Sequence, residues 1–174
     1  MLTQEQENWL AGFNTNDSVQ VFPYDPRCQD IFEEVKKTIQ NKLGESIKIE
    51  HHGASSLGIS GQDEIDIYIL VSTAEFNDMV LKVSSLFGEP KSISQTKRAR
   101  FRTDVDNKKI DLFVSNAEHE EWKKHVKFKQ YLLDNSEALQ EYKEIKENSS
   151  GKSSKEYYRV KLEFINRIFE QMDK

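Results

Sequence analysis

Polar and apolar side chains alternate strictly over residues 64–70, which is the pattern of a β-strand with two unlike faces. Three isoleucines lie on one face, and Glu64, Asp66 and Tyr68 lie on the other. A turn of small residues at 53–56, Gly-Ala-Ser-Ser, precedes this strand by a short loop. Backbone N–H groups of such a turn can hold phosphate while nearby carboxylates hold a divalent metal, so this segment predicts nucleotidyl transfer chemistry.

Periodicity and capping signals predict the remaining elements. Strands are expected at 19–22 and 46–51, and an antiparallel pair at 97–105 and 109–115. Helices are expected over 26–44 behind Asp25, from the capping box of Ser72 and Glu75 to Gly88, and over 118–134, 137–147 and 156–172. The sequence therefore predicts a single α+β domain over 1–174. A twisted mixed sheet with two helices on one side is expected within 17–116, and a helical C-terminal region over 117–174.

A third acid lies on the strand expected at 109–115. Asp111 faces away from the apolar residues Ile110 and Leu112. If this strand neighbours the 64–70 strand with their polar faces aligned, Glu64, Asp66 and Asp111 form a cluster that can bind two Mg²⁺ ions for phosphoryl displacement. The alternative is a solvated sheet face whose acids are balanced by nearby lysines and arginines.

Arg98, Arg100 and Arg102 occupy every second position of one expected strand, so their guanidinium groups share a face. A guanidinium group matches two phosphate oxygens at once, and a row of three could follow a triphosphate chain beside the metal site. Two alternatives are that the row marks a charged edge strand that resists aggregation, and that it neutralises the three acids.

Two lysines and two histidines are further candidates. Lys129 and Lys161 each interrupt the apolar stripe of an expected helix, so each either extends to solvent or meets an anion such as a substrate phosphate. His51 and His52 precede the turn, where one could position substrate. The histidines lack zinc-ligand spacing, so a buried and hydrogen-bonded role is expected for these two.

The composition limits the kinds of site, compartment and partner that the protein can have. Cys28 is the single cysteine among 174 residues, which excludes an intrachain disulfide and a zinc site built from several cysteines. The chain has no signal-peptide pattern and no apolar run near the roughly 20 residues of a membrane span, so we expect a cytoplasmic protein without a membrane partner. A net charge of −5 argues against a surface made chiefly for nucleic acid. The sequence does not indicate the oligomeric state.

Four segments together resemble the GrpB-like family: Val-Phe-Pro-Tyr-Asp-Pro-Arg at 21–27, His-His-Gly-Ala-Ser-Ser at 51–56, Ile-Asp-Ile at 65–67 and Phe-Lys-Gln-Tyr-Leu at 128–132. The resemblance implies a fold of the polymerase-β-type nucleotidyltransferase superfamily, whose signature is a Gly-Ser turn followed by an acidic strand. Ala54 and Tyr68 depart from that signature, because they stand where a serine and a second acid are expected. Asp111 would supply the third acid at a position where many family members carry histidine.

Three hypotheses follow. In the first, the chain is a magnesium-dependent nucleotidyltransferase that transfers from a nucleoside triphosphate to an unknown acceptor, with Glu64, Asp66 and Asp111 as catalytic metal ligands. The residues that would then hold substrate phosphates are Gly53, Ser55, Ser56, Arg98, Arg100, Arg102, Lys129 and Lys161. In the second, the domain binds a nucleotide or another phosphorylated metabolite without turnover. In the third, the charged C-terminal helices mediate a protein interaction and the acids are merely solvated.

Overall fold

The computed structural model describes residues 1–14 and 16–172, which form two compact units. Tyr24–Ile59 and Asp63–Val126 make up the first, which we call the sheet unit. Met1–Pro23, Ser60–Gln62 and the chain from Lys127 onward make up the second, the helical unit. The three candidate acids and the three arginines all belong to the sheet unit.

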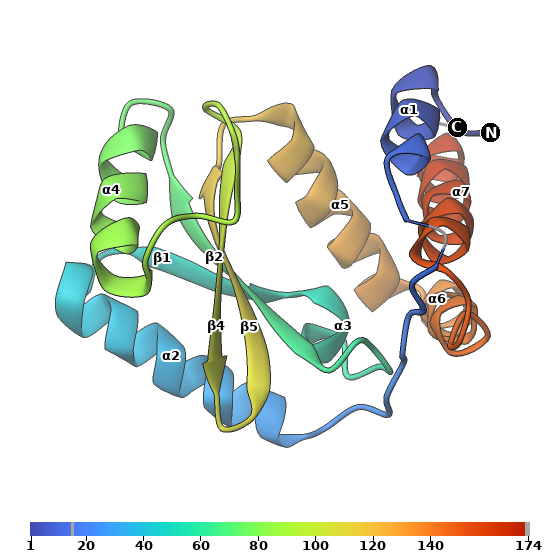
Figure 1. Ribbon diagram of the computed structural model, residues 1–174, viewed down its shortest axis with the longest axis horizontal. Helices are drawn as coiled ribbons and strands as arrows, with labels where there is room; N and C mark the ends of the chain where they lie inside the picture. The colour runs from blue at the N-terminus through green and yellow to red at the C-terminus, as the bar shows by residue number, and fades with distance from the viewer. Residues whose placement is uncertain (15, 173–174) are drawn as a thin grey trace. The chain divides into compact units, whose positions relative to one another are not determined.

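The sheet unit is built on a five-stranded mixed sheet with the strand order β1-β2-β5-β4-β3 (Figure 1). The strands are β1 (Lys48–His52), β2 (Glu64–Val71), β3 (Ser92–Ser94), β4 (Arg98–Val105) and β5 (Lys108–Asn116). β2 and β5 are parallel neighbours, and the other neighbouring pairs are antiparallel. The expected mixed sheet and the expected pairing of β4 with β5 are both confirmed.

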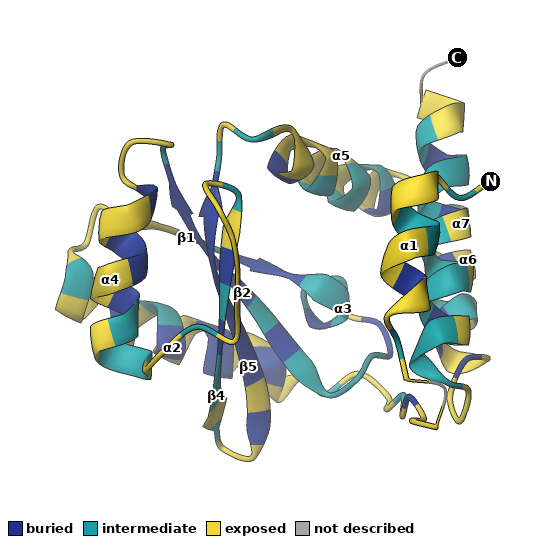
Figure 2. Cartoon of the chain, turned by 45° about the horizontal axis from the view of Figure 1, so that its top comes forward, coloured by how far each residue is buried: buried dark blue, intermediate teal, exposed yellow. Residues whose placement is uncertain are grey.

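Helices α2 (Arg27–Leu43) and α4 (Phe76–Phe87) cover one face of this sheet (Figure 1). Because side chains alternate along a strand, the apolar residues of β2 and β5 all point to this face and are almost completely buried: Ile65, Ile67, Ile69, Ile110, Leu112 and Val114. Figure 2 shows the same division in α4, whose inner side is buried and whose outer side is exposed. The fold class is therefore α+β, as the hydrophobic pattern predicts.

The opposite face carries the polar residues and a small aromatic cluster. Tyr68, Leu70 and Phe113 pack there with Trp122 of α5 (Glu120–Asp134), a helix that begins in the sheet unit and continues into the helical unit. The rings of Tyr68 and Phe113 stack with centroids 4.6 Å apart. This cluster occupies the C-terminal half of β2, so the N-terminal half of the strand is left to the acids.

Within the described residues, the helical unit consists of the second half of α5 with α1 (Gln4–Ala11), α6 (Ser136–Glu147) and α7 (Ser154–Met172). Phe128 of α5 meets Tyr142 of α6 and Phe164 of α7, with ring centroids 5.5 and 6.1 Å away. Arg159 of α7 pairs with Glu7 of α1 at 2.7 Å. The C-terminal region is helical, as expected.

Three local features differ from what the sequence predicts. Residues 19–22 are not a strand: Phe22 forms an isolated bridge with Gly61, and the backbone of Val19 is hydrogen-bonded to Gly151 and Lys152 in a loop, so among the described residues this segment joins no continuous ladder. The edge strand β3 was not predicted, since its residues are all exposed and carry no alternation of burial. The expected turn at 53–56 is a single-turn helix, α3 (Gly53–Ser56). Among the described residues we find no helix with the length and apolar character needed to cross a membrane.

Candidate functional site

The register of the sheet brings three acidic side chains together. In the ladder between β2 and β5, Asp66 lies directly beside Asp111, and Glu64 lies on the same face two residues earlier. One carboxylate oxygen from each of the three lies within 4.8 Å of the others. Diverging acids would have favoured the protein-interaction hypothesis, whereas converging acids can share a cation.

The glycine turn lies directly against this cluster. His52, the last residue of β1, is paired with Asp66, and Gly53 follows with a φ of +72°, which glycine adopts without strain. A Cβ atom at position 53 would come within 1.9 Å of Asp66 Oδ2. The missing side chain of Gly53 therefore allows the turn to close on the acids.

The two serines of the turn hold hydrogen bonds inside the sheet unit. Ser55 is buried, and its hydroxyl contacts His51 Nε2 at 2.9 Å and donates to the backbone oxygen of Glu64 at 3.3 Å. Ser56 donates to the backbone oxygen of Gly53 at 2.9 Å. Both hydroxyls shape the turn, and their role in phosphate binding stays a prediction.

Two of the three arginines are engaged by Asp111. β4 pairs with β5 so that Arg102 lies beside Asp111, and its guanidinium group donates to both carboxylate oxygens, at 2.8 and 2.9 Å. Arg100 donates to one of these oxygens at 2.6 Å. Arg102 also reaches Glu64, at 3.4 Å. Arg100 and Arg102 therefore neutralise the most deeply buried of the three acids.

This pairing keeps the buried Asp111 ionised. Burial opposes ionisation of Asp111, but the hydrogen bonds from Arg102 and Arg100 outweigh it and hold the pKa of the carboxyl below its ordinary value. The Asp111 side chain is only 4% exposed, whereas that of Glu64 is 24% exposed. Glu64 and Asp66 are both half-buried and are thus less deeply buried than Asp111.

Two of the three carboxylates, Glu64 and Asp66, are suitable ligands for a divalent cation such as Mg²⁺. Carboxylate oxygens are ligands that Mg²⁺ prefers, and the half-buried Glu64 and Asp66 offer them side by side. Asp111 fits less directly, because both of its oxygens already accept hydrogen bonds from arginine. The residues therefore fit a metal held chiefly by Glu64 and Asp66.

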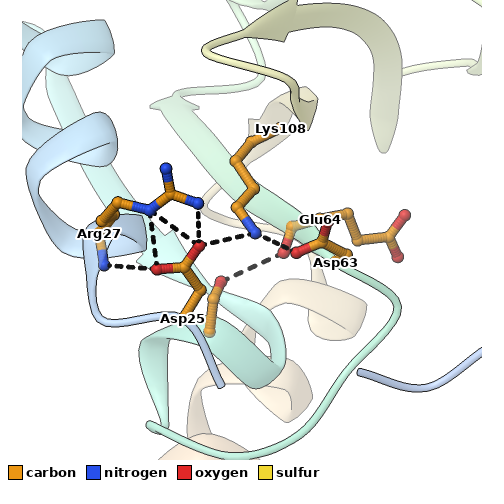
Figure 3. A network of polar contacts seen from close by, with 6 residues as sticks. Asp25, Arg27, Asp63, Glu64 and Lys108 are labelled. Carbon is orange, nitrogen blue, oxygen red and sulfur yellow. Dashed lines mark hydrogen bonds and ion pairs between the residues drawn. The ribbon is translucent and has the colours of Figure 1, made fainter. Parts of the chain in front are cut away.

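An ionic network fixes the chain next to Glu64 (Figure 3). The ammonium group of the buried Lys108, at the start of β5, lies between the carboxylate of Asp25, at 2.9 Å, and that of Asp63, which it contacts closely. Burial disfavours the charged lysine, but the bonds to Asp63 and Asp25 outweigh it and raise the pKa of Lys108. Arg27 binds Asp25 from the other side. Asp63 has a φ of +58°, so this network holds an uncommon backbone conformation just before Glu64.

Replacing Lys108 with methionine is expected to lower the free energy of unfolding by about 1–3 kcal/mol, because it leaves the Asp63 carboxylate without its ammonium partner. Unfolding in urea followed by circular dichroism measures the change. Lys109→Met is the matched control, since Lys109 is the exposed neighbour on the same strand and should change stability by less than about 0.5 kcal/mol. Equal effects of the two substitutions would contradict a special role for Lys108.

A pair of hydrogen-bonded histidines lies on the same sheet face as the acids. His52 Nε2 contacts Glu50 Oε2 at 2.9 Å, and His52 Nδ1 contacts His125 Nε2 at 2.9 Å. The buried His52 thus has a partner at each ring nitrogen, as expected for a histidine beside the turn. The two histidines are 73 residues apart, and the packing of α5 on the sheet brings them together, so local sequence pattern does not connect them.

The remaining cationic candidates lie away from the acids or in the other unit. The guanidinium carbon of Arg98 lies 5.1 Å from the ring centroid of Phe113. Lys129 and Lys161 belong to the helical unit, where Lys161 Nζ lies 5.5 Å from the ring centroid of Tyr158. The predicted contacts of these three residues with substrate phosphates stay predictions.

A family model described as GrpB protein matches residues 18–171. The chain is 28% identical over 150 residues to a UPF0157 protein of Vibrio cholerae, which covers 85% of this chain and 79% of that protein. It is 26% identical over 176 residues to the glutamate-rich protein GrpB of Alkalihalophilus pseudofirmus, which covers 94% of this chain and 100% of that protein.

The crystal structure of the conserved protein GrpB from Enterococcus faecalis has the same fold, with a TM-score of 0.63 at 19% sequence identity. The superposition covers 86% of this chain and 99% of that one. Sequence and fold thus agree over nearly the whole length of the protein. The chain belongs to the GrpB family.

Proposed function

We propose that this protein is a magnesium-dependent nucleotidyltransferase that uses a nucleoside triphosphate as donor. The observation that carries the proposal is the convergence of Glu64, Asp66 and Asp111 within 4.8 Å, directly against Gly53. A small-residue turn offers backbone N–H groups to phosphate, and adjacent carboxylates offer ligands to a metal. The resemblance to the polymerase-β-type superfamily supports the same chemistry, since its signature combines such a turn with an acidic strand.

Each residue takes the part that its position allows. Glu64 and Asp66 would hold the metal, and Asp111 would join them when Arg100 and Arg102 exchange its carboxylate for substrate phosphates. Guanidinium groups can make this exchange because carboxylate and phosphate are both anionic and both accept two parallel hydrogen bonds. When bound, Mg²⁺ supplies positive charge that stabilises the attacking and leaving oxygens of a phosphoryl displacement. The turn at Gly53 would orient the phosphates beside that metal.

Isothermal titration calorimetry with ATP, repeated with GTP, CTP and UTP, tests the proposal. We expect at least one of the four to bind in the presence of Mg²⁺. Asp66→Asn should weaken this binding at least about tenfold, because it removes a ligand charge from the metal. Glu89→Gln is the matched control, since it removes one negative charge at an exposed loop position of the sheet unit and should leave affinity unchanged. Absence of binding by all four nucleotides at millimolar concentration would overturn the proposal.

A second candidate function is nucleotide or phosphometabolite binding without turnover. Two observations favour it: Asp111 already accepts hydrogen bonds from two arginines, and Tyr68, which stands where the superfamily has a second acid, is buried against Phe113. In this case a nucleotide would bind equally well in EDTA, and Asp66→Asn would leave affinity unchanged or improve it because repulsion of phosphate falls. The same titrations in EDTA therefore separate the two functions.

A further inference from the structure

A small pocket opens on the polar side of the sheet, toward the end of β2 that lies away from the glycine turn. Its lining includes Tyr68, Arg98, Ser115 and His119. Tyr68 lies two residues beyond Asp66 on β2, and Ser115 lies four residues beyond Asp111 on β5. With a rise of about 3.3 Å per residue, the pocket lies about 7–13 Å from the acids along the strands.

Arg98 differs from the other two arginines of its strand. Arg100 and Arg102 are held by Asp111, whereas Arg98 forms no ion pair with a carboxylate among residues 1–14 and 16–172. Its guanidinium group lies over the ring of Phe113 instead. A guanidinium group stacked on a ring keeps its N–H edges available to a ligand. Of the three arginines, Arg98 at the pocket is therefore the one that makes no ion pair with a carboxylate of the described residues.

Other hydrogen-bond donors line the same pocket. His119 Nδ1 accepts the backbone N–H of Glu121 at 3.2 Å, so the neutral ring carries its proton on Nε2 and presents a donor there. Ser115 is only 4% exposed, and its hydroxyl makes no hydrogen bond within the part of the chain that the structure describes. Lys97 pairs with Glu121 at 2.9 Å. The pocket thus combines two permanent cations, Lys97 and Arg98, with a single carboxylate.

We propose that this pocket binds a phosphate group carried by the acceptor substrate, an assignment that rests on the function proposed above. The hydrogen-bond donors of the pocket come from three parts of the sheet unit. Arg98 begins β4 and Lys97 directly precedes it, Ser115 lies on β5, and His119 directly precedes α5. Donors from several directions suit the three terminal oxygens of a phosphate group better than the two oxygens of a carboxylate. A bound phosphate also gives the Ser115 hydroxyl an acceptor.

The position of the pocket favours the acceptor over the nucleotide. The turn at Gly53 lies beside Asp66, near the start of β2, so nucleotide phosphates held by that turn lie at one end of the polar face. Arg98 and Ser115 lie toward the other end. A molecule anchored there can place a hydroxyl about 7–13 Å away at the acids. The acceptor class is therefore a small alcohol that also carries a phosphate group.

Calorimetric titration with sodium phosphate, in the absence of divalent metal, tests the pocket itself. We expect saturable binding that weakens about tenfold in Arg98→Gln, since the charge-assisted hydrogen bonds from the guanidinium group to the phosphate are lost. Lys91→Gln is the matched control, because it removes one positive charge at an exposed position outside the pocket lining and should leave binding unchanged. Sodium acetate at the same ionic strength should bind more weakly. Absence of phosphate binding, or equal binding by the wild type and Arg98→Gln, would overturn the proposal.

A second titration separates the acceptor from the nucleotide. Phosphate added to protein that is saturated with ATP and Mg²⁺ should bind with an unchanged dissociation constant. Competition would show that the pocket takes a phosphate of the nucleotide, which would overturn the acceptor assignment. If no nucleotide binds while phosphate binding still depends on Arg98, the phosphate site stands, whereas the proposed function and the acceptor assignment both fall.

Discussion

Asp111→Asn is expected to lower the free energy of unfolding at pH 7 by about 2–3 kcal/mol, because Arg100 and Arg102 lose the charge that they share. Asparagine keeps the shape of the side chain and one acceptor oxygen, so the effect reports chiefly on charge. A fully buried pair would lose more, but both arginine side chains are 36% exposed and can be hydrated. Urea unfolding measures the change, and the melting temperature should fall by about 5–10 °C.

The effect of Asp111→Asn should disappear in acid. The pKa of the Asp111 carboxyl is lower in the folded protein than in the unfolded chain, so the folded state binds this proton less readily. The stability that Asp111 contributes is therefore complete above the unfolded value of about 4 and is lost as the pH falls through the lower, folded value. The difference between wild type and variant should be full at pH 7 and should shrink steadily below about pH 4.

Asp104→Asn is the matched control for this comparison. Asp104 lies on β4 near Arg102 but is exposed, so its replacement should change stability by less than about 0.5 kcal/mol at either pH. Other carboxyls that titrate in acid, such as Asp25, are common to all three proteins and cancel in the differences. A loss in Asp111→Asn no larger than in Asp104→Asn, or a loss that does not depend on pH, would contradict the ionic role of Asp111.

The faces of the strands could be predicted from the sequence, because side-chain direction in a strand follows from position alone. Alternation assigns Asp66 and Asp111 to the polar faces of their strands, and the parallel register of β2 and β5 then places them side by side. Helices α2 and α4 were predicted because their apolar stripes are regular and their ends carry glycine. The segment 19–22 was mistaken for a strand because a short apolar run does not reveal whether a partner strand is available.

The partners of the candidate residues could not be predicted in the same way. Alternation places Arg100 and Arg102 on the face of Asp111, but it leaves open whether their guanidinium groups bind that carboxylate or a substrate. Lys108 looks like an ordinary turn lysine in the sequence, and only the approach of Asp25 and Asp63 makes it a buried ion-pair centre. Contacts of this kind depend on distances between segments far apart in the chain, which local pattern does not encode.

Gly53→Ala is expected to lower the free energy of unfolding by about 3 kcal/mol and to disturb the acid cluster. Alanine at a φ of +72° costs about 1–2 kcal/mol by itself, because its Cβ approaches the carbonyl oxygen. The new methyl group would also lie 1.9 Å from Asp66 Oδ2 and 2.9 Å from Asp66 Cγ, so the carboxylate must move. If the proposed function is right, affinity for nucleotide with Mg²⁺ should fall as well, since Asp66 leaves its position beside Glu64.

Gly58→Ala separates the backbone effect from the collision. Gly58 has a φ of +67°, close to that of Gly53, but a Cβ there meets no atom within 4 Å. Its replacement should therefore cost only the backbone term, about 1–2 kcal/mol, and should leave nucleotide binding unchanged. Equal losses in the two variants would show that position 53 is constrained by backbone conformation alone.

A double-mutant cycle with Asp66→Ala identifies the atoms that collide. Shortening Asp66 removes Oδ2 and Cγ and leaves its Cβ, which lies 3.2 Å from the new methyl group, a distance that a small shift can relieve. In the Asp66→Ala background, Gly53→Ala should therefore cost about as much as Gly58→Ala does in the wild type. The interaction energy between positions 53 and 66 should be about 1–2 kcal/mol. Strict additivity would mean that the turn does not close on the carboxylate, so the proposed phosphate-binding turn and the proposed metal-binding acid would not form one site.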